Sequence, residues 1–310
     1  MTTAITCVLI GDETLLVTCG DSLRNRGHDI RAVVTYEPGV RDWAVSAGIA
    51  AFDTGSEMAK ALGAGSVDWL FSIANLKMLR PEVLAIARNG GINFHDGPLP
   101  RYAGLNAPVW ALLDHEQEFA VTWHLMEGGV DEGDILAQMP VRIEEDDTAF
   151  SLNWKCYGAA AESFEGVADQ IEAGALNRVA QDLSQRSYFG RYHRPEAGAM
   201  IDPAGAGEDI TRLVQALDFG GYWNPLTVAR VDLGGGVVAA IKNARATAAT
   251  GIGGAGTVLE STGDSIVIAT TTHAVRLDGL TTLDGGPVAL PEVGSALPPL
   301  DATRRSALED

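Results

Sequence analysis

The first 70 residues alternate short apolar runs with amphipathic stretches, and this alternation restricts the fold more than any other feature of the chain. Predicted strands lie at Ile5 to Ile10, Ile30 to Thr35 and Asp68 to Ile73, and Glu13 to Arg26 is a predicted helix. Strands joined by helices of this length are typical of a parallel sheet with crossover connections. We therefore expect an α/β fold with an open, Rossmann-like, mostly parallel sheet.

Later segments extend the pattern with further helices and strands. Helices are predicted at Pro81 to Arg88, at Asn106 to Asp114 and, amphipathic throughout, at Thr148 to Ala173, with Asp146 or Asp147 as N-cap. Further strands are predicted at Ile92 to Phe94 and Ala120 to Met126. Beyond the last helix the composition shifts, and Ser184 to Pro203 looks like a connection rich in Gly, Pro, Arg and aromatic residues.

The C-terminal third contains a predicted helix at Asp209 to Ala216, followed by short runs of Val, Ile and Thr separated by Gly- or Asp-containing turns. This pattern favours a small antiparallel sheet or an OB-like barrel. The predicted organisation is an α/β domain at 1–186, a linker at 187–202, a β-rich domain at 203–290 and a Pro-rich tail or linker at 291–310.

Composition and short motifs exclude several classes of function. The turn after Ile10 carries neither a dinucleotide fingerprint nor a P-loop. Lys and Arg number 22 against 41 Asp and Glu, a net charge of −19, which disfavours nucleic acid as the main ligand. The three cysteines are an odd number without metal-ligand spacing, which argues against a disulfide framework or a zinc ribbon, so we expect a reduced, cytoplasmic location. No apolar run approaches the ~20 residues that span a membrane.

The segment around Asn93 and His95 carries the strongest sign of chemistry. A strand that ends in Asn-x-His places both side chains on one face at the carboxyl edge of the sheet, where ligands of open α/β folds bind. The amide can donate to a developing oxyanion, and the imidazole can accept a proton near neutral pH. An isolated Asn-x-His is also common at ordinary strand ends, so a second motif is needed.

That second motif is the stretch 122–136, which contains Val130-Asp131-Glu132-Gly133-Asp134-Ile135. Together the two segments resemble the 10-formyltetrahydrofolate-dependent formyltransferases, which include methionyl-tRNA formyltransferase. That family has Asn-x-His after a strand and an Asp in a Val-Asp-x-Gly-x-Ile loop. The separation here, 131 − 93 = 38 residues, matches the family spacing.

The resemblance implies a catalytic trio of Asn93, His95 and Asp131 in the formyltransferase domain 1–186. His95 would transfer protons, Asn93 would stabilise the oxyanion, and Asp131 would orient His95 and strengthen it as a base. Thr122 and His124 match a Thr-x-His of some members, although His124 is equally well explained as a packed strand residue.

The resemblance also implies a donor cosubstrate, 10-formyltetrahydrofolate, and no metal. Carried over by position, the residues expected to contact it lie in the loop before Pro81 and in the loop after Leu125: Lys77, Met78, Leu79, Met126, Gly128 and Val130. A plain strand-to-helix turn would explain the first loop as well.

The acceptor is less well specified by the sequence. Two segments, His95 to Asn106 and Ala149 to Tyr157, look most like the formyltransferase domains of nonribosomal peptide synthesis. The implied acceptor is the amine of an amino acid, free or held on a carrier protein, with a peptide synthetase as partner. Where many members read His-x-Ser-Leu-Leu-Pro, this chain has His95-Asp96-Gly97-Pro98-Leu99-Pro100.

Several alternatives stay open. They are formylation of a hydroxyornithine, of an amino sugar on a nucleotide or of methionyl-tRNA, hydrolysis of the formyl donor, and a docking domain without activity. The region 203–290 has five basic and eight acidic residues, 5 − 8 = −3, which argues against tRNA. The intact polar trio argues against a docking domain.

Overall fold

The computed structural model describes residues 4–248, 253–302, 305 and 308. Their packing separates into two compact units. The first contains residues up to 107, 118–142 and 153–190, and the second contains 108–117, 143–152 and the residues from 191 onward. In the described part of the chain, no helix is long and apolar enough to cross a membrane.

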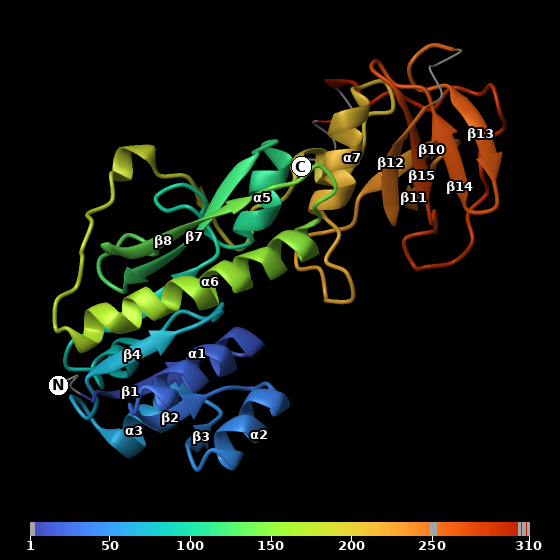
Figure 1. The fold of residues 1–310 in the computed structure, drawn as a ribbon. Coiled ribbons are helices and arrows are strands. Elements are labelled where there is room, and N and C mark those ends of the chain that lie inside the picture. Colours follow the sequence, from blue (N-terminus) through green and yellow to red (C-terminus); the bar gives the residue numbers. More distant parts are fainter. Residues whose placement is uncertain (1–3, 249–252, 303–304, 306–307, 309–310) are drawn as a thin grey trace. The chain divides into compact units, whose positions relative to one another are not determined.

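A seven-stranded sheet in the order β3-β2-β1-β4-β5-β7-β8 forms the first unit (Figure 1). Its first five strands in chain order run parallel, and β7 and β8 are antiparallel to their neighbours. The expected mostly parallel, Rossmann-like sheet is confirmed. The strands are β1 (Thr6–Ile10), β2 (Asp29–Val34), β3 (Ala50–Phe52), β4 (Trp69–Ser72), β5 (Gly91–His95), β7 (Glu118–Leu125) and β8 (Ile135–Arg142).

Helices connect these strands in the sequence: α1 (Thr14–Asn25), α2 (Pro38–Ser46), α3 (Gly55–Leu62), α4 (Pro81–Leu84), α5 (Ala107–Leu113) and α6 (Ala149–Glu172). One face of the sheet packs against α3 and α4 through a buried cluster in which Ile10 and Leu70 meet Met58. On the opposite face, Phe71 contacts Phe164 of α6 with ring centroids 5.6 Å apart. Both faces are therefore covered, as the nearly continuous apolar strands predict.

Two local expectations need correction. The helix predicted at Pro81 to Arg88 ends at Leu84, because Ala87 forms a parallel bridge with Val67 and the Arg88 N–H donates to the Val67 carbonyl at 2.9 Å. Helix α6 begins at Ala149, so its N-cap position is Thr148 and neither Asp146 nor Asp147; Thr148 Oγ1 accepts from the Ser151 N–H at 3.2 Å, and Asp147 Oδ1 accepts from Ser151 Oγ at 2.7 Å.

The second unit confirms a β-rich C-terminal region. It contains the helix α7 (Gly207–Ala216), and its described strands form two antiparallel sheets: β12-β15-β14-β13, and β10-β11. These strands are β10 (Arg230–Gly234), β11 (Val237–Ala240), β12 (Asn243–Thr247), β13 (Val258–Thr262), β14 (Ser265–Ile268) and β15 (Ala274–Asp278). The sequence pattern did not assign β12.

Part of the predicted tail at 291–310 packs against this unit. Ser295 accepts from the Val258 N–H at 2.9 Å, Leu297 donates to Gly256, and Leu297 and Leu300 are buried. Of the predicted tail, residues 303–304, 306–307 and 309–310 lie outside the described residues. As limits of independently folding domains, 1–186, 187–202, 203–290 and 291–310 stay a proposal.

Candidate active site

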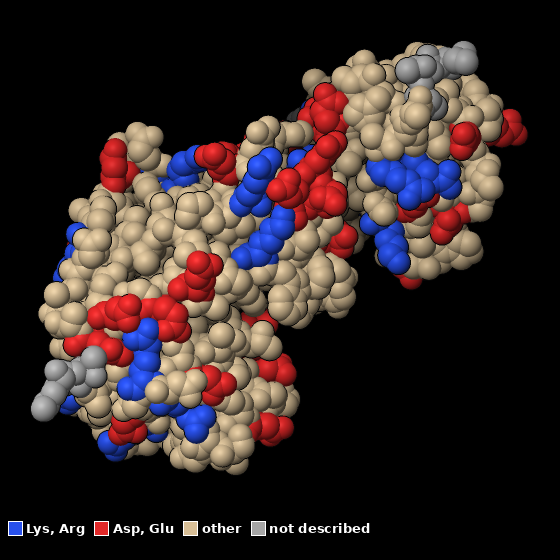
Figure 2. Space-filling view, viewed as in Figure 1, with Lys and Arg blue, Asp and Glu red and all other residues tan. Residues whose placement is uncertain are grey.

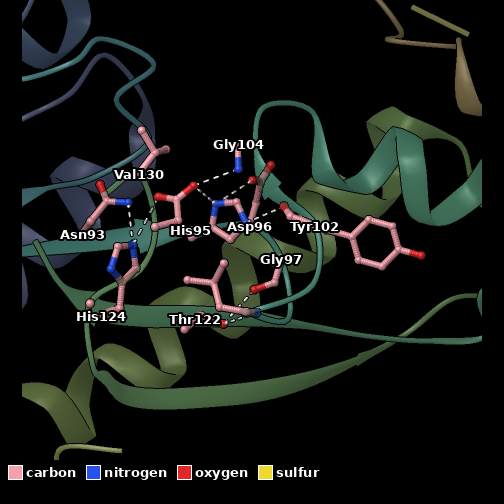
Figure 3. A network of polar contacts seen from close by, with 12 residues as sticks. Asn93, His95, Asp96, Gly97, Tyr102, Gly104, Thr122, His124 and Val130 are labelled. Atoms are coloured by element: carbon pink, nitrogen blue, oxygen red, sulfur yellow. Dashed lines mark hydrogen bonds and ion pairs between the residues drawn. The ribbon is translucent and has the colours of Figure 1, made fainter. Parts of the chain in front are cut away.

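The register between β5 and β7 brings the polar residues of two strands together. Asn93 lies opposite His124, and His95 lies opposite Thr122. Side chains directly across an antiparallel pair share a face, and residues two apart on one strand do as well. The four side chains therefore lie on one face at the carboxyl end of β5, as Figure 3 shows.

The orientation of the His95 ring follows from one contact. Its Nε2 lies 2.9 Å from the backbone oxygen of Tyr102, and a carbonyl oxygen can only accept, so Nε2 carries a proton. The other ring nitrogen, Nδ1, lies 3.7 Å from Asp131 Oδ2 and 4.0 Å from Asp96 Oδ1. Of the two ring nitrogens, Nδ1 is therefore the one able to accept a proton, and it lies between the side chains of Asp131 and Asp96.

His124 links the two other members of the predicted trio. Its Nδ1 lies 2.9 Å from the Leu125 carbonyl oxygen and is a donor for the same reason. Its Nε2 lies 3.2 Å from Asn93 Nδ2 and 3.5 Å from Asp131 Oδ1. His124 is only 3% exposed, yet its polar contacts join Asn93 to Asp131, so it is more than a packed strand residue.

Asp131 occupies the loop between β7 and β8 in a left-handed conformation, with a φ of 58°. Its Oδ2 accepts from the Gly104 N–H at 2.8 Å, and a Cβ at Gly104 would overlap the Phe189 carbonyl. Burial by itself would raise the pKa of Asp131. Hydrogen bonding to His124, the charges of His95 and His124, and the Gly104 N–H outweigh it and lower that pKa to about 2.

The segment after His95 is also fixed from β7 and β8. Thr122 Oγ1 donates to the Gly97 carbonyl at 2.7 Å, and Gln138 Nε2 donates to Thr122 Oγ1 at 2.9 Å. A Cβ at Gly97 would lie 2.7 Å from His95 Nε2. Gly97 therefore makes room for the imidazole, because any side chain at this position would overlap the ring.

The residues expected to contact the folate lie in two groups. Leu79 and Met126 pack against the same buried cluster, which brings their loops to one side of the sheet. Lys77, Met78 and Leu79 line a cavity of about 450 Å³ with residues that follow β1 and β2. Among the described residues, its lining includes none of the second group, Met126, Gly128 and Val130, and none of the predicted trio.

Sequence reasoning missed three contributors to the site. Tyr102 supplies the carbonyl that orients His95, Gln181 contacts the backbone of the Asp131 loop, and Arg186 donates to the Val130 carbonyl at 2.9 Å. Contacts to backbone carbonyls leave no pattern in a single sequence, so no local signal could have found them.

Comparisons with known proteins agree with this fold. A model of the formyl transferase family matches residues 7–164. The chain resembles WlaRD, a sugar 3N-formyl transferase crystallised in the presence of dTDP and 5-N-formyl-THF. Their TM-score is 0.70 and their identity is 18%, over 89% of this chain and 98% of that one.

Two further structures are similar. An N-formyltransferase from Helicobacter canadensis, in complex with folinic acid and dTDP-3-aminofucose, has a TM-score of 0.69 at 17% identity, over 89% of this chain and 99% of that one. HypX from Aquifex aeolicus, in complex with tetrahydrofolic acid, has a TM-score of 0.65 at 17% identity, over 89% of this chain and 44% of that one.

Proposed function

Because the chain belongs to the formyl transferase family, whose model matches residues 7–164, we propose that it transfers a formyl group from 10-formyltetrahydrofolate to a primary amine. The observation that carries this proposal is the cluster at the carboxyl end of β5. There an amide donor contacts one imidazole at 3.2 Å, and an ionised carboxylate lies 3.5 Å from that imidazole and 3.7 Å from a second one. This set can polarise a carbonyl and move a proton.

Each group has a distinct task in the proposed reaction. 10-Formyltetrahydrofolate supplies an activated formyl carbon. His95 Nδ1 accepts the proton that the amine loses as its nitrogen bonds to that carbon. Asn93 Nδ2 donates to the formyl oxygen as negative charge develops there. Protonated His95 then returns its proton to the folate nitrogen as the bond from that nitrogen to the formyl carbon breaks.

The surroundings of His95 favour its transient positive charge. Nδ1 faces Asp131 at 3.7 Å, and opposite charges at this distance stabilise each other. Asp96 Oδ1 lies 4.0 Å from the same nitrogen, but burial raises the pKa of Asp96, so Asp131 is the better source of negative charge. Because the pKa of Asp131 is about 2, this carboxylate is ionised throughout the range in which enzymes of this kind operate. Asp131 therefore acts as a charge that supports His95, and we assign it no proton transfer.

Two exposed apolar side chains support a folate near this edge of the sheet. Leu76 and Met78, in the loop after β4, are 81% and 78% exposed. A ligand with an aromatic ring system would cover such side chains. WlaRD, the Helicobacter canadensis enzyme and HypX are each described with a folate, which favours the same donor for this chain.

For the acceptor, we propose the amine of an amino acid, free or on a carrier protein of a peptide synthetase, in natural-product biosynthesis. The segments His95 to Asn106 and Ala149 to Tyr157 support it through their resemblance to synthetase-associated domains. A nucleotide-linked amino sugar is the second candidate, because the Helicobacter canadensis structure holds dTDP-3-aminofucose. The proposed location is the cytoplasm, since the three cysteines predict no disulfide framework.

A panel assay tests the proposal. The protein is incubated with 10-formyltetrahydrofolate and free amino acids, carrier-bound amino acids, hydroxyornithine or dTDP-amino sugars, and tetrahydrofolate release and formylated product are measured. We expect release that depends on one amine class. Turnover without an acceptor would instead indicate a hydrolase, and no release with any amine would refute formyl transfer.

Variants tie the activity to the site. His95→Ala and Asn93→Ala are each expected to lower kcat by about 10² to 10³-fold, because they remove the base and the oxyanion donor. His115→Ala is a matched control, since His115 is exposed and pairs with Asp209 in the second unit. Undiminished turnover in His95→Ala would refute the assigned role of His95.

A further inference from the structure

Residues 178–189, here called the bracing segment, follow α6 and were assigned from sequence to the region where the α/β domain ends and a linker begins. In the structure they lie against the loop 127–134, which carries Asp131. Three of their side chains reach that loop: Arg178, Gln181 and Arg186. These contacts bear on the proposed reaction because Asp131 is the carboxylate that supports His95.

Gln181 makes the most direct contacts. Its Nε2 donates to the backbone oxygen of Asp131 at 2.9 Å and to that of Gly133 at 2.6 Å. Both acceptors are carbonyls, so the NH₂ group must face them and both of its N–H groups are used. Gln181 Oε1 is buried and has no hydrogen-bond partner in the described part of the chain. A buried acceptor without a partner costs free energy, so packing alone does not explain a glutamine at this position. The two hydrogen bonds that the Gln181 NH₂ group donates do explain it.

The backbone that Gln181 holds is in an uncommon conformation. Asp131 has a φ of 58°, which costs free energy for a residue with a Cβ. At Gly133 a Cβ would overlap the Leu125 carbonyl, so the loop folds back closely onto the end of β7. The two hydrogen bonds from Gln181 lie on either side of this turn and stabilise it.

The two arginines add less. Arg178 contacts Glu127 at 2.6 Å and Asp134 at 2.8 Å, but its side chain is 46% exposed, and exposed ion pairs contribute little. Arg186 donates to the Val130 carbonyl at 2.9 Å and lies 3.8 Å from Glu132. Gln181 is therefore the member of the bracing segment with the most direct hold on Asp131.

The same segment also holds the opposite wall of the site. Ser187 Oγ accepts from the Tyr102 N–H at 2.8 Å, and β9 (Tyr188–Phe189) pairs with β6 (Ala103–Gly104). This wall presents the Tyr102 carbonyl to His95 and the Gly104 N–H to Asp131. Both partners of the His95–Asp131 pair are thus fixed from one stretch of chain.

We propose that Gln181 is a positioning residue for formyl transfer, which holds the turn at 131–133 so that the Asp131 carboxylate faces His95 and His124. This inference rests on the proposed function. Gln181 contacts the backbone oxygens of Asp131 and Gly133 and touches no reacting atom. Loss of the Gln181 side chain should therefore displace Asp131, so that its carboxylate supports the charge on His95 less well. Misplacements of about 1 Å at a catalytic group can cost about 10²-fold in rate.

Two substitutions separate hydrogen bonding from packing. Gln181→Glu keeps the shape but sets a carboxylate oxygen against two carbonyls, and Gln181→Ala removes the group. We expect kcat to fall by about 10- to 100-fold in both, with Glu at least as low as Ala, and KM for the folate to stay within about twofold. A packing role predicts Glu near wild type and Ala low.

Gln170 offers a matched control. Its Nε2 donates to the Leu136 carbonyl at 3.1 Å, and its Oε1 accepts from the Asn177 N–H at 2.9 Å. Like Gln181, it therefore links two segments through their backbone groups, here β8 and the chain after α6. It makes neither of the two hydrogen bonds to the Asp131 turn. Gln170→Ala and Gln170→Glu should lower stability without the same loss of kcat.

A crystal structure of Gln181→Glu provides a readout independent of activity. We expect the φ of residue 131 to leave the left-handed region and its carboxylate to move away from His95. An unchanged Asp131, or a kcat within about twofold of wild type in both folded Gln181 variants, would overturn the inference. If wild type transfers no formyl group to any acceptor, the proposed function fails, whereas the structure still decides the role of Gln181.

Discussion

The two histidines show how single contacts decide what a residue can do. Tyr102 and Leu125 each present a carbonyl oxygen to one ring nitrogen, which fixes a proton there and leaves the other nitrogen facing Asp131. The chemistry available at His95 therefore follows from its backbone neighbour as much as from its own side chain.

The carboxylate of Asp131 gives a prediction about pH. Its pKa in the folded protein, about 2, lies below the value in an unfolded chain. The stability that this group contributes is therefore complete above about pH 4 and is lost as the pH falls through about 2, a change of roughly 2 kcal/mol. Asp131→Asn should lack this part of the acid destabilisation, which urea denaturation at several pH values measures.

The same variant should lower kcat at about pH 7 by about 10² to 10³-fold, because the amide no longer offsets the charge on His95. His115→Ala is a useful comparison, since His115 is exposed and pairs with Asp209 at 3.0 Å, outside the site. Equal acid destabilisation of wild type and Asp131→Asn would contradict the low pKa.

Gly97 gives a second prediction at this scale. In Gly97→Ala the new methyl group would lie 2.7 Å from His95 Nε2 and 3.1 Å from the Ala107 Cβ, so the imidazole must move away from the Tyr102 carbonyl. We expect kcat to fall by about 10- to 100-fold with the fold retained, as steady-state kinetics and circular dichroism measure. A kcat of Gly97→Ala equal to that of the wild type would contradict this prediction and show that the reaction tolerates a displaced His95 ring.

Among the elements, α6 packs against one face of the sheet and holds strand β7 there. Trp123 Nε1 donates to the Ala160 carbonyl at 3.2 Å and to Ser163 Oγ at 3.1 Å, and its ring lies 5.0 Å from that of Phe164. Trp123 precedes His124 on β7 and points to the other face of the sheet. The helix therefore anchors the strand whose opposite side carries the site.

Gly158 of α6 offers a prediction for this element. It is exposed, and a Cβ added there meets no atom within 4 Å. Gly158→Ala should therefore stabilise the protein by about 0.5 to 1 kcal/mol, because alanine restricts the unfolded chain and favours helix. Thermal denaturation measures the change.

Gly20→Ala in α1 is the control and should destabilise the protein, because the new Cβ would overlap the Trp43 ring. A melting temperature raised by both substitutions would contradict the packing argument.

For the whole molecule, the net charge of −19 is the dominant property. On the face shown in Figure 2, Lys and Arg side chains lie beside Asp and Glu side chains over both units. Arg276 is an example, with Asp278 at 2.7 Å and Glu260 at 3.7 Å. Paired cations release few counterions from a polyanion, so they add little affinity for nucleic acid.

This gives a prediction for tRNA. Methionyl-tRNA should bind with a Kd weaker than about 10⁻⁴ M at physiological salt and should not be formylated, because the acidic surface repels it. Filter binding at two salt concentrations, with a known methionyl-tRNA formyltransferase as positive control, measures this. Micromolar binding with a steep salt dependence would contradict it.

The sequence by itself predicted the strands β1, β2, β4, β5 and β7, the strand-end position of Asn93 and His95, and the loop position of Asp131, but it assigned neither β3 nor β8. These features depend on apolar periodicity and turn-forming residues, which are local. The helix at Pro81 was predicted too long because its end is set by a bridge between Ala87 and Val67, which is not local.

Only the tertiary structure decided that His124 joins the site and that Gln181 reaches the Asp131 turn. His124 lies opposite Asn93 because of one register between β5 and β7, and a shift of one residue would move every side chain of β7 to the other face. Gln181 lies 50 residues beyond Asp131 and binds its backbone oxygen, an atom that every residue has. Contacts of that kind depend on where the folded chain passes, which residue identity alone does not encode.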